Sequence, residues 1–150
     1  MTVIEIRSAS EADLADIQAC ARQAYAKYIE RMNQEPAPMH ADFALQIANG
    51  WVDVAVGEIG LVGYVVYYQR DDHVHLENVS VSPEFSGGGI GKRLIAHVEL
   101  FARNAGSQAV ELYTNEAMTE NLAMYQRFGY REVDRRHEGG FSRVFFRKQL

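Results

Sequence analysis

The chain has 150 residues, of which 47% are apolar and 23% charged, a balance typical of one folded domain with a packed core. Its formal charge of -5 disfavours a nucleic-acid partner bound through phosphates; it either slightly favours cationic small molecules or only aids solubility. A single cysteine, Cys20, excludes an intramolecular disulfide and a multi-cysteine metal site. The first ten residues lack a signal-peptide pattern and no apolar run could span a bilayer, so we expect a cytoplasmic protein without a membrane partner.

The N-terminal third predicts a short strand followed by helices. Val3, Ile4 and Ile6 indicate the strand, and Ser10 begins a helix because Asp13 stands at the capping-box distance. Apolar residues then recur at helical spacing: Leu14, Ile17, Ala21, Ala24, Tyr25 and Tyr28. The two prolines of NQEPAPM interrupt this pattern, and a short helix over about residues 42–48 follows.

The middle of the chain changes to strand patterns. Three β-rich runs, WVDVAVGE, GLVGYVVYYQR and HVHLENVSVS, are separated by turns at EIG and RDD. We expect them to form an antiparallel meander.

Helical spacing returns at Ile90, and the apolar face of this helix is expected to hold Ile90, Leu94, Ile95, Val98, Phe101 and Ala102. Gly106 ends the helix. A strand AVELYT, a short helix NLAMYQRF ending at Gly129, and two strands around EGG complete the chain. The sequence therefore predicts a single α/β domain of the α+β type over residues 1–150, with about seven mostly antiparallel strands and about four helices.

The segment VSVSPEFSGGGIGKRL, from Val79 to Leu94, places a glycine run between a strand and a helix. Backbone amides at a helix start attract anions, and glycine lets a phosphate approach the backbone, although a flexible loop is the alternative. A P-loop is excluded because Ser86 and Arg93 stand where a glycine and a hydroxyl are needed. A dinucleotide fingerprint fails because its third glycine would fall at Lys92 or Leu94.

The remaining pattern resembles the coenzyme A loop of the Gcn5-related N-acetyltransferase superfamily, [Q/R]-x-x-G-x-[G/A] after a strand ending V-x-P. Val81-Ser82-Pro83, Gly89 and Gly91 match this pattern, whereas Ser86 stands where a long polar side chain is usual. The later segment NEAMTENLAMYQRFGY resembles the second cofactor segment of the family, and the element order is similar over essentially the full chain.

The resemblance implies a site for acetyl-CoA. A metal held by His73, His75 and Glu77 on one strand face is a weaker alternative, and we expect none. The glycine loop would hold the pyrophosphate, and the pantetheine would pair with the backbone near Val79 and Val81, in a splay between strands around Val79 and Leu112. The implied cofactor residues are Val79, Val81, Ser86, Gly87, Gly88, Gly89, Ile90, Gly91, Lys92, Asn121 and Tyr125. Capping near Thr119 is the alternative role for Asn121.

The resemblance also implies catalytic roles for Tyr125 and Glu77. Tyr125 is the candidate acid for the leaving thiolate, since a phenol with its ordinary pKa of about 10 is protonated near neutrality; core packing is the alternative. Glu77 is the candidate base for the amine, and such a base works best with a raised pKa; a salt-bridged strand residue is the alternative. His75 could relay or replace it, and His73 and His75 share its strand face.

The acceptor pocket is the part of the site that the sequence indicates least clearly. Tyr25, Tyr28, Glu77 and Tyr113, together with Phe43, are candidates to line its pocket, because aromatic faces beside acidic groups suit an ammonium; core packing is the alternative. We expect an acyltransferase that transfers acetyl directly to a primary amine of a small molecule or peptide. A non-catalytic acyl-CoA-binding domain, or another acyl donor or acceptor, is the alternative, and a homodimer is left open by the family resemblance.

Overall fold

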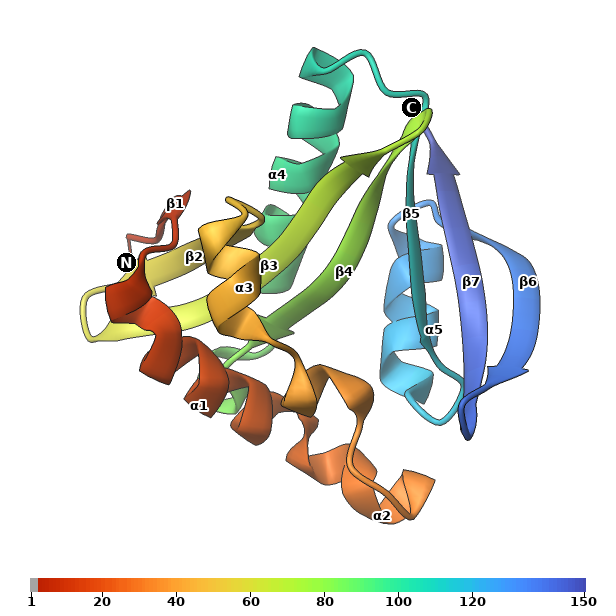
Figure 1. Cartoon of the computed structure of the whole chain (residues 1–150), viewed down its shortest axis with the longest axis horizontal. Coiled ribbons are helices and arrows are strands. Elements are labelled where there is room, and N and C mark those ends of the chain that lie inside the picture. Colours follow the sequence, from red (N-terminus) through yellow and green to blue (C-terminus); the bar gives the residue numbers. More distant parts are fainter. Residues whose placement is uncertain (1–2) are drawn as a thin grey trace. The chain divides into compact units, whose positions relative to one another are not determined.

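The structure, a computed structural model, describes residues 3–150, so Met1 and Thr2 of the segment inspected for a signal peptide lie outside it. The described chain forms a seven-stranded sheet in the order β1-β2-β3-β4-β5-β7-β6 (Figure 1). The strands are β1 Glu5–Ser8, β2 Val52–Gly57, β3 Gly60–Arg70, β4 His73–Val81, β5 Ala109–Asn115, β6 Arg131–Glu138 and β7 Phe141–Gln149. The helices are α1 Leu14–Tyr25, α2 Ile29–Met32, α3 Phe43–Ala48, α4 Ile90–Asn104 and α5 Thr119–Arg127. The predicted fold class is confirmed.

The chain divides into two compact units. The first unit holds residues up to 67 together with 78–96, and the second holds residues 68–77 and 97–150. β3, β4 and α4 each contribute residues to both units. The single-domain boundary, 1–150, stays a prediction.

The first unit contains antiparallel pairing of β1 with β2, from Glu5 opposite Val56 to Ser8 opposite Asp53. β2 pairs with β3 antiparallel, as the meander prediction requires, with an irregularity between Ala55 and Val56. β1 begins at Glu5, two residues later than the predicted strand, so Val3 and Ile4 precede it. The polar residues of β1 can occupy a strand because most of them are exposed, while β2 pairs with the backbone of β1.

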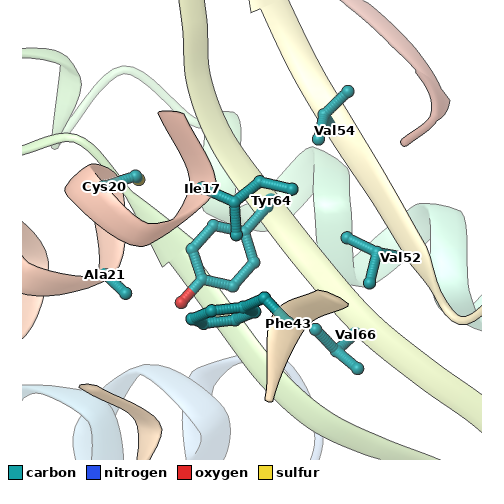
Figure 2. Close-up of a cluster of buried hydrophobic side chains, with 8 residues drawn as sticks. All are labelled: Ile17, Cys20, Ala21, Phe43, Val52, Val54, Tyr64 and Val66. Carbon is teal, nitrogen blue, oxygen red and sulfur yellow. The ribbon is translucent and has the colours of Figure 1, made fainter. Parts of the chain in front are cut away.

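Buried side chains from α1, α3, β2 and β3 form the core of the first unit (Figure 2). Its members are Ile17, Cys20, Ala21, Phe43, Val52, Val54, Tyr64 and Val66. Phe43 meets Tyr64 edge-on, with ring centroids 5.4 Å apart. Cys20 lies in this core, where it packs as a small apolar residue.

The start of α1 is held by the predicted capping interaction. The Asp13 carboxylate accepts from the Ser10 backbone N–H at 2.8 Å and from the Arg7 guanidinium at 2.9 and 3.0 Å. The hydrogen bond with Arg7 is the main reason that the pKa of Asp13 falls to about 2. This carboxylate therefore links β1 to the first helix.

The second unit contains the parallel part of the sheet. β4 pairs with β5 in parallel, from His73 opposite Ala109 to His75 opposite Glu111. β7 then pairs antiparallel with both β5 and β6. The sheet is thus mixed and mostly antiparallel where its pairing is described, as expected.

α4 buries a slightly different face from the one predicted. Ile90, Leu94, Ile95, Val98 and Ala102 are buried, but Phe101 is 42% exposed, so that part of the prediction is wrong. Glu99 is buried instead, because its partners on neighbouring elements satisfy its carboxylate. The helix ends at Asn104, and Gly106 follows it with a φ of 77°, as the predicted glycine stop requires; the Ser107 N–H donates to the Ala102 carbonyl at 2.9 Å. No helix within residues 3–150 is long and apolar enough to cross a membrane.

Candidate active site

The glycine-rich segment begins with a tight turn at the end of β4. A 3-10 turn, Pro83–Phe85, follows the strand, and Phe85 N–H donates to the Ser82 carbonyl at 2.9 Å. The hydroxyl of Ser86 donates to the Pro83 carbonyl at 2.8 Å. Ser86 therefore stabilises the turn with its own side chain, directly before the glycines.

Two glycines of the loop have left-handed backbone conformations. Gly87 has a φ of 82° and Gly89 a φ of 84°, and a Cβ at either position would meet no atom within 4 Å. Glycine is thus required here by backbone conformation rather than by crowding. Arg93 N–H donates to the Gly89 carbonyl at 3.0 Å, which is the first turn of α4.

The same geometry is the test of whether this loop fits a phosphate. Ser86, Gly87, Gly88 and Gly89 are exposed, and they lead directly into the N-terminus of a helix of 15 residues. The first amides of a helix have no partner within it, and the helix dipole favours an anion there. The loop residues present therefore fit the pyrophosphate of coenzyme A.

Cationic side chains adjoin the loop. Lys92 is exposed in the first turn of α4, so its charge can add to that of the helix dipole. Arg93 instead donates to the Ile4 carbonyl at 2.9 Å, 89 residues earlier in the chain. Arg93 thus fastens the start of α4 to the N-terminal segment.

The second half of β4 alternates in burial. Asn78, Ser80 and Ser82 are buried, whereas Val79 and Val81 are partly exposed and share the opposite face. Ser80 donates to the Tyr64 hydroxyl at 3.2 Å, and Ser82 lies 3.7 Å from the Cys20 sulfur. The buried polar face packs within the first unit, and the face of Val79 and Val81 stays partly exposed.

Tyr25 acts on this strand from the buried side. Its hydroxyl donates to the Asn78 side-chain oxygen at 2.9 Å and lies 3.3 Å from the Val79 carbonyl. Burial raises the pKa of Tyr25 to about 12, so the hydroxyl stays a donor throughout the physiological range. The structure thus shows Tyr25 holding β4; its contact with an acceptor stays a prediction.

Tyr28 and the core residue Phe43 are likewise buried. Lys27 Nζ lies 5.1 Å from the Tyr28 ring centroid, and the Arg31 guanidinium carbon lies 5.2 Å from it. The ring therefore already interacts with cations of this chain.

In the second unit, Glu77 and His75 form a close pair. The distance between His75 Nε2 and Glu77 Oε2 is 2.7 Å. The pKa of Glu77 is lowered, mainly by this hydrogen bond and against the effect of burial, with a further contribution from the charge of Arg143. This shift is opposite to the raised pKa expected of an efficient base, because the partners favour the carboxylate.

Aromatic rings enclose the His75 side of this pair. The His75 ring centroid lies 5.4 Å from that of Tyr68 and 5.8 Å from that of Tyr113. Burial raises the pKa of both phenols, so both remain protonated near neutrality. The guanidinium carbon of Arg143 lies 4.6 Å from the Tyr113 ring centroid, so one aromatic face proposed for the acceptor already carries a cation.

His73, which the strand pattern groups with His75, interacts with other carboxylates. Its Nδ1 lies 3.0 Å from Asp72 and its Nε2 lies 3.6 Å from Glu111. Among residues 3–150, no group of three or more His, Cys, Asp and Glu side chains is arranged to hold a metal ion.

Tyr125 and Asn121 both lie on α5, one turn apart. Tyr125 is 5% exposed, and its ring centroid lies 5.9 Å from those of Tyr130 and Phe146. The side-chain amide of Asn121 lies 3.7 Å from the Met118 sulfur, at the start of the helix. Tyr125 is therefore packed against the sheet side of the second unit, as the core-packing alternative requires, and this packing is compatible with an acid role.

The structure thus groups the predicted residues into sets within each unit. The loop adjoins Val79 and Val81 in the first unit, and Glu77, His75 and Tyr113 cluster in the second. Sequence reasoning missed Tyr68 and Arg143 beside Glu77, and the buried Glu99. The signal for Glu99 was its position four residues after Ile95 and three before Ala102, on the apolar face of α4.

One family model matches most of the chain. Residues 14–130 match the model of the "Acetyltransferase (GNAT) family". A search of curated protein sequences gave no significant match.

Solved structures support the same fold. The PaiA N-acetyltransferase from Thermoplasma acidophilum, in complex with coenzyme A, is 19% identical with a TM-score of 0.84, covering 99% of each chain. The ribosomal-protein-S18-alanine N-acetyltransferase from Escherichia coli is 16% identical with a TM-score of 0.79, covering 99% of this chain and 94% of that one. A streptothricin acetyltransferase from Bacillus anthracis, described as putative and bound to acetyl coenzyme A, is 17% identical with a TM-score of 0.62, covering 66% and 61%.

Proposed function

Because the chain belongs to the acetyltransferase (GNAT) family, we propose that it is an acetyl-CoA-dependent N-acetyltransferase acting by direct transfer to a primary amine of a small molecule or peptide. The observation that carries the proposal is the exposed glycine turn into α4, in which Gly87 and Gly89 have left-handed backbone conformations. This turn lies within the residues that match the family model.

The loop residues bind the donor substrate in this proposal. Backbone amides of Gly87–Gly91 and the charge of Lys92 hold the pyrophosphate, and the backbone of Val79 and Val81 pairs with the pantetheine. Asn121 supplies a further polar contact. Acetyl-CoA, when bound, supplies an acetyl group activated as a thioester, and the Val81 backbone N–H donates to its carbonyl oxygen as negative charge develops there.

Two side chains move the protons of the transfer. As the C–N bond forms and the C–S bond breaks, the amine gives up a proton to the Glu77 carboxylate, through water, and the thiolate receives one from Tyr125. The lowered pKa of Glu77 ensures that it is ionised near neutrality, at the cost of basicity. His75 lies 2.7 Å from Glu77 and can receive the proton from it. His75 is therefore kept as the alternative base.

The acceptor amine is proposed to approach Glu77 beside Tyr113, because the carboxylate attracts the ammonium form of the amine. This form loses one proton to solvent before attack, and Glu77 accepts the second proton as the C–N bond forms. With Arg143 over the Tyr113 ring, this attraction comes from the carboxylate more than from the aromatic face. The named activities of the structurally similar proteins differ. We therefore propose only the chemical class of the acceptor, a primary amine.

Calorimetric titration with acetyl-CoA, beside ATP and NAD in the same buffer, is the first test. Selective micromolar binding of acetyl-CoA supports the donor assignment, and release of CoA in the presence of a panel of amines supports transfer. Larger acyl-CoA donors and alcohol acceptors in the same assay separate the related chemistries. Binding with no CoA release across the panel would favour the non-catalytic acyl-CoA-binding alternative, and the absence of binding would contradict the proposal.

A further inference from the structure

A buried carboxylate in the second unit has no role in the chemistry described so far. Glu99 on α4 is 7% exposed. One of its oxygens accepts from the Tyr130 hydroxyl at 2.8 Å, and the other accepts from Lys148 Nζ at 3.0 Å. A buried charge is costly even when paired, and such groups are retained in some proteins because they specify one arrangement of the surrounding elements.

The partners of Glu99 come from two other parts of the second unit. Tyr130 follows the end of α5, and Lys148 lies on β7. Gly129 makes the approach possible: its φ is 93°, and a Cβ there would lie 3.3 Å from the Lys148 side chain. The carboxylate thus joins α4 to the end of α5 and to β7 by charge-assisted hydrogen bonds.

This network reaches the proposed acid through Tyr130. The ring of Tyr130 stands edge-on to that of Tyr125, at 5.9 Å between centroids and 66° between planes. The Tyr130 backbone N–H also donates to the Tyr125 carbonyl at 3.0 Å. The ring centroid of Phe146 also lies 5.9 Å from that of Tyr125, so Tyr125 contacts one hydrogen-bonded ring and one purely apolar ring.

We propose that Glu99 is a positioning residue, which fixes Tyr125 for proton donation by anchoring the Tyr130 hydroxyl and the Lys148 ammonium. The inference rests on the proposed acid role of Tyr125. The hydrogen bond to Glu99 restricts the orientation of the Tyr130 ring, whereas a ring without a hydroxyl could change its orientation. A small misplacement of a catalytic group lowers the reaction rate more than it weakens binding.

Tyr130→Phe is the sharpest test, because it removes only the hydroxyl that reaches Glu99 and keeps the ring against Tyr125. We expect kcat to fall at least fivefold while the Kd of acetyl-CoA stays within twofold. Tyr67→Phe is the matched control: it removes a tyrosine–carboxylate hydrogen bond of 2.6 Å, to Asp53, in the first unit. It should leave kcat within twofold.

The double variant Tyr125→Phe/Tyr130→Phe separates positioning from general loss of structure. If Tyr130 acts through Tyr125, the double variant turns over no more slowly than Tyr125→Phe alone. Additive losses, or a Tyr130→Phe enzyme as fast as the wild type, would overturn the inference. Should Tyr130→Phe fail to fold, Glu99→Gln takes its place in the same cycle, with the same expected non-additivity.

The failure of the proposed function has a different signature. If Tyr125→Phe itself retains the wild-type kcat, the acid assignment is wrong and the positioning role is overturned with it. If Tyr125→Phe is slow and Tyr130→Phe is not, the acid role stands and only the role of Glu99 is rejected.

Discussion

The two units carry their candidate functional groups in different chemical forms. In the first unit the candidate groups are mainly backbone: the amides of a glycine turn, the start of α4 and one face of β4. In the second unit they are side chains with specific partners, Glu77 with His75 and Tyr125 with Tyr130. The contrast teaches that changes in the first unit should alter donor binding, whereas changes in the second should alter turnover.

The largest effect is expected from Tyr125→Phe, because it removes the donor for the leaving thiolate. We expect kcat to fall about 100-fold, the lower end of the range for a general acid, with the Kd of acetyl-CoA within threefold. Steady-state kinetics and calorimetry on the same preparation measure the two quantities. If the affinity for acetyl-CoA fell in parallel with kcat, Tyr125 would be a donor-binding residue, and the assignment of turnover to the second unit would be wrong.

Glu77→Gln is expected to lower kcat/KM about 30-fold near neutral pH, since it removes the proposed proton acceptor. Because the pKa of Glu77 is lowered in the fold, its carboxylate stays ionised through the pH range in which an ordinary glutamate becomes protonated. It is protonated only at lower pH. The wild-type pH profile should therefore show no inflection from Glu77 near neutrality. A larger loss of kcat/KM in His75→Gln than in Glu77→Gln would assign the base to His75 instead.

Gly89→Val should raise the Kd of acetyl-CoA at least tenfold, about 1.4 kcal/mol, because a β-branched residue resists the left-handed conformation of the loop. Gly140→Val is a matched control in the β6–β7 turn. Gly140 has a φ of 83° against 84° for Gly89, and a Cβ at either would meet no atom within 4 Å. Equal loss of affinity in both variants would show a general effect of strain rather than a binding loop.

The smallest effect is expected from Asp13→Asn, which should lower the free energy of unfolding by about 1 kcal/mol at pH 7 and leave donor affinity unchanged. The folded pKa of about 2 lies below the ordinary value, so this stabilisation is present above about pH 4 and lost as the pH falls toward 2. The half-exposed Arg7 partner makes the gain smaller than the full shift would give. Denaturant titrations of both proteins at pH 7 and pH 2.5 measure this; a constant difference would contradict it.

Much of the fold was predictable because its signals are local. The Ser10–Asp13 capping pair, the glycine helix ends at Gly106 and Gly129, and the turns between strands act within a few residues. Predictions weakened where sequence neighbours do not decide burial: Phe101 fits the apolar period but is exposed, and Glu99 breaks it but is buried.

For the candidate site, the glycine turn was predictable from the residues alone, since a run of glycines before a helix start is a property of one short segment. The tertiary structure decided the partners of the ionisable and hydroxyl side chains. Tyr25 reaches Asn78 across 53 residues, and Tyr130 and Lys148 reach Glu99 across 31 and 49. These contacts depend on how elements distant in the sequence pack together, which no local pattern encodes.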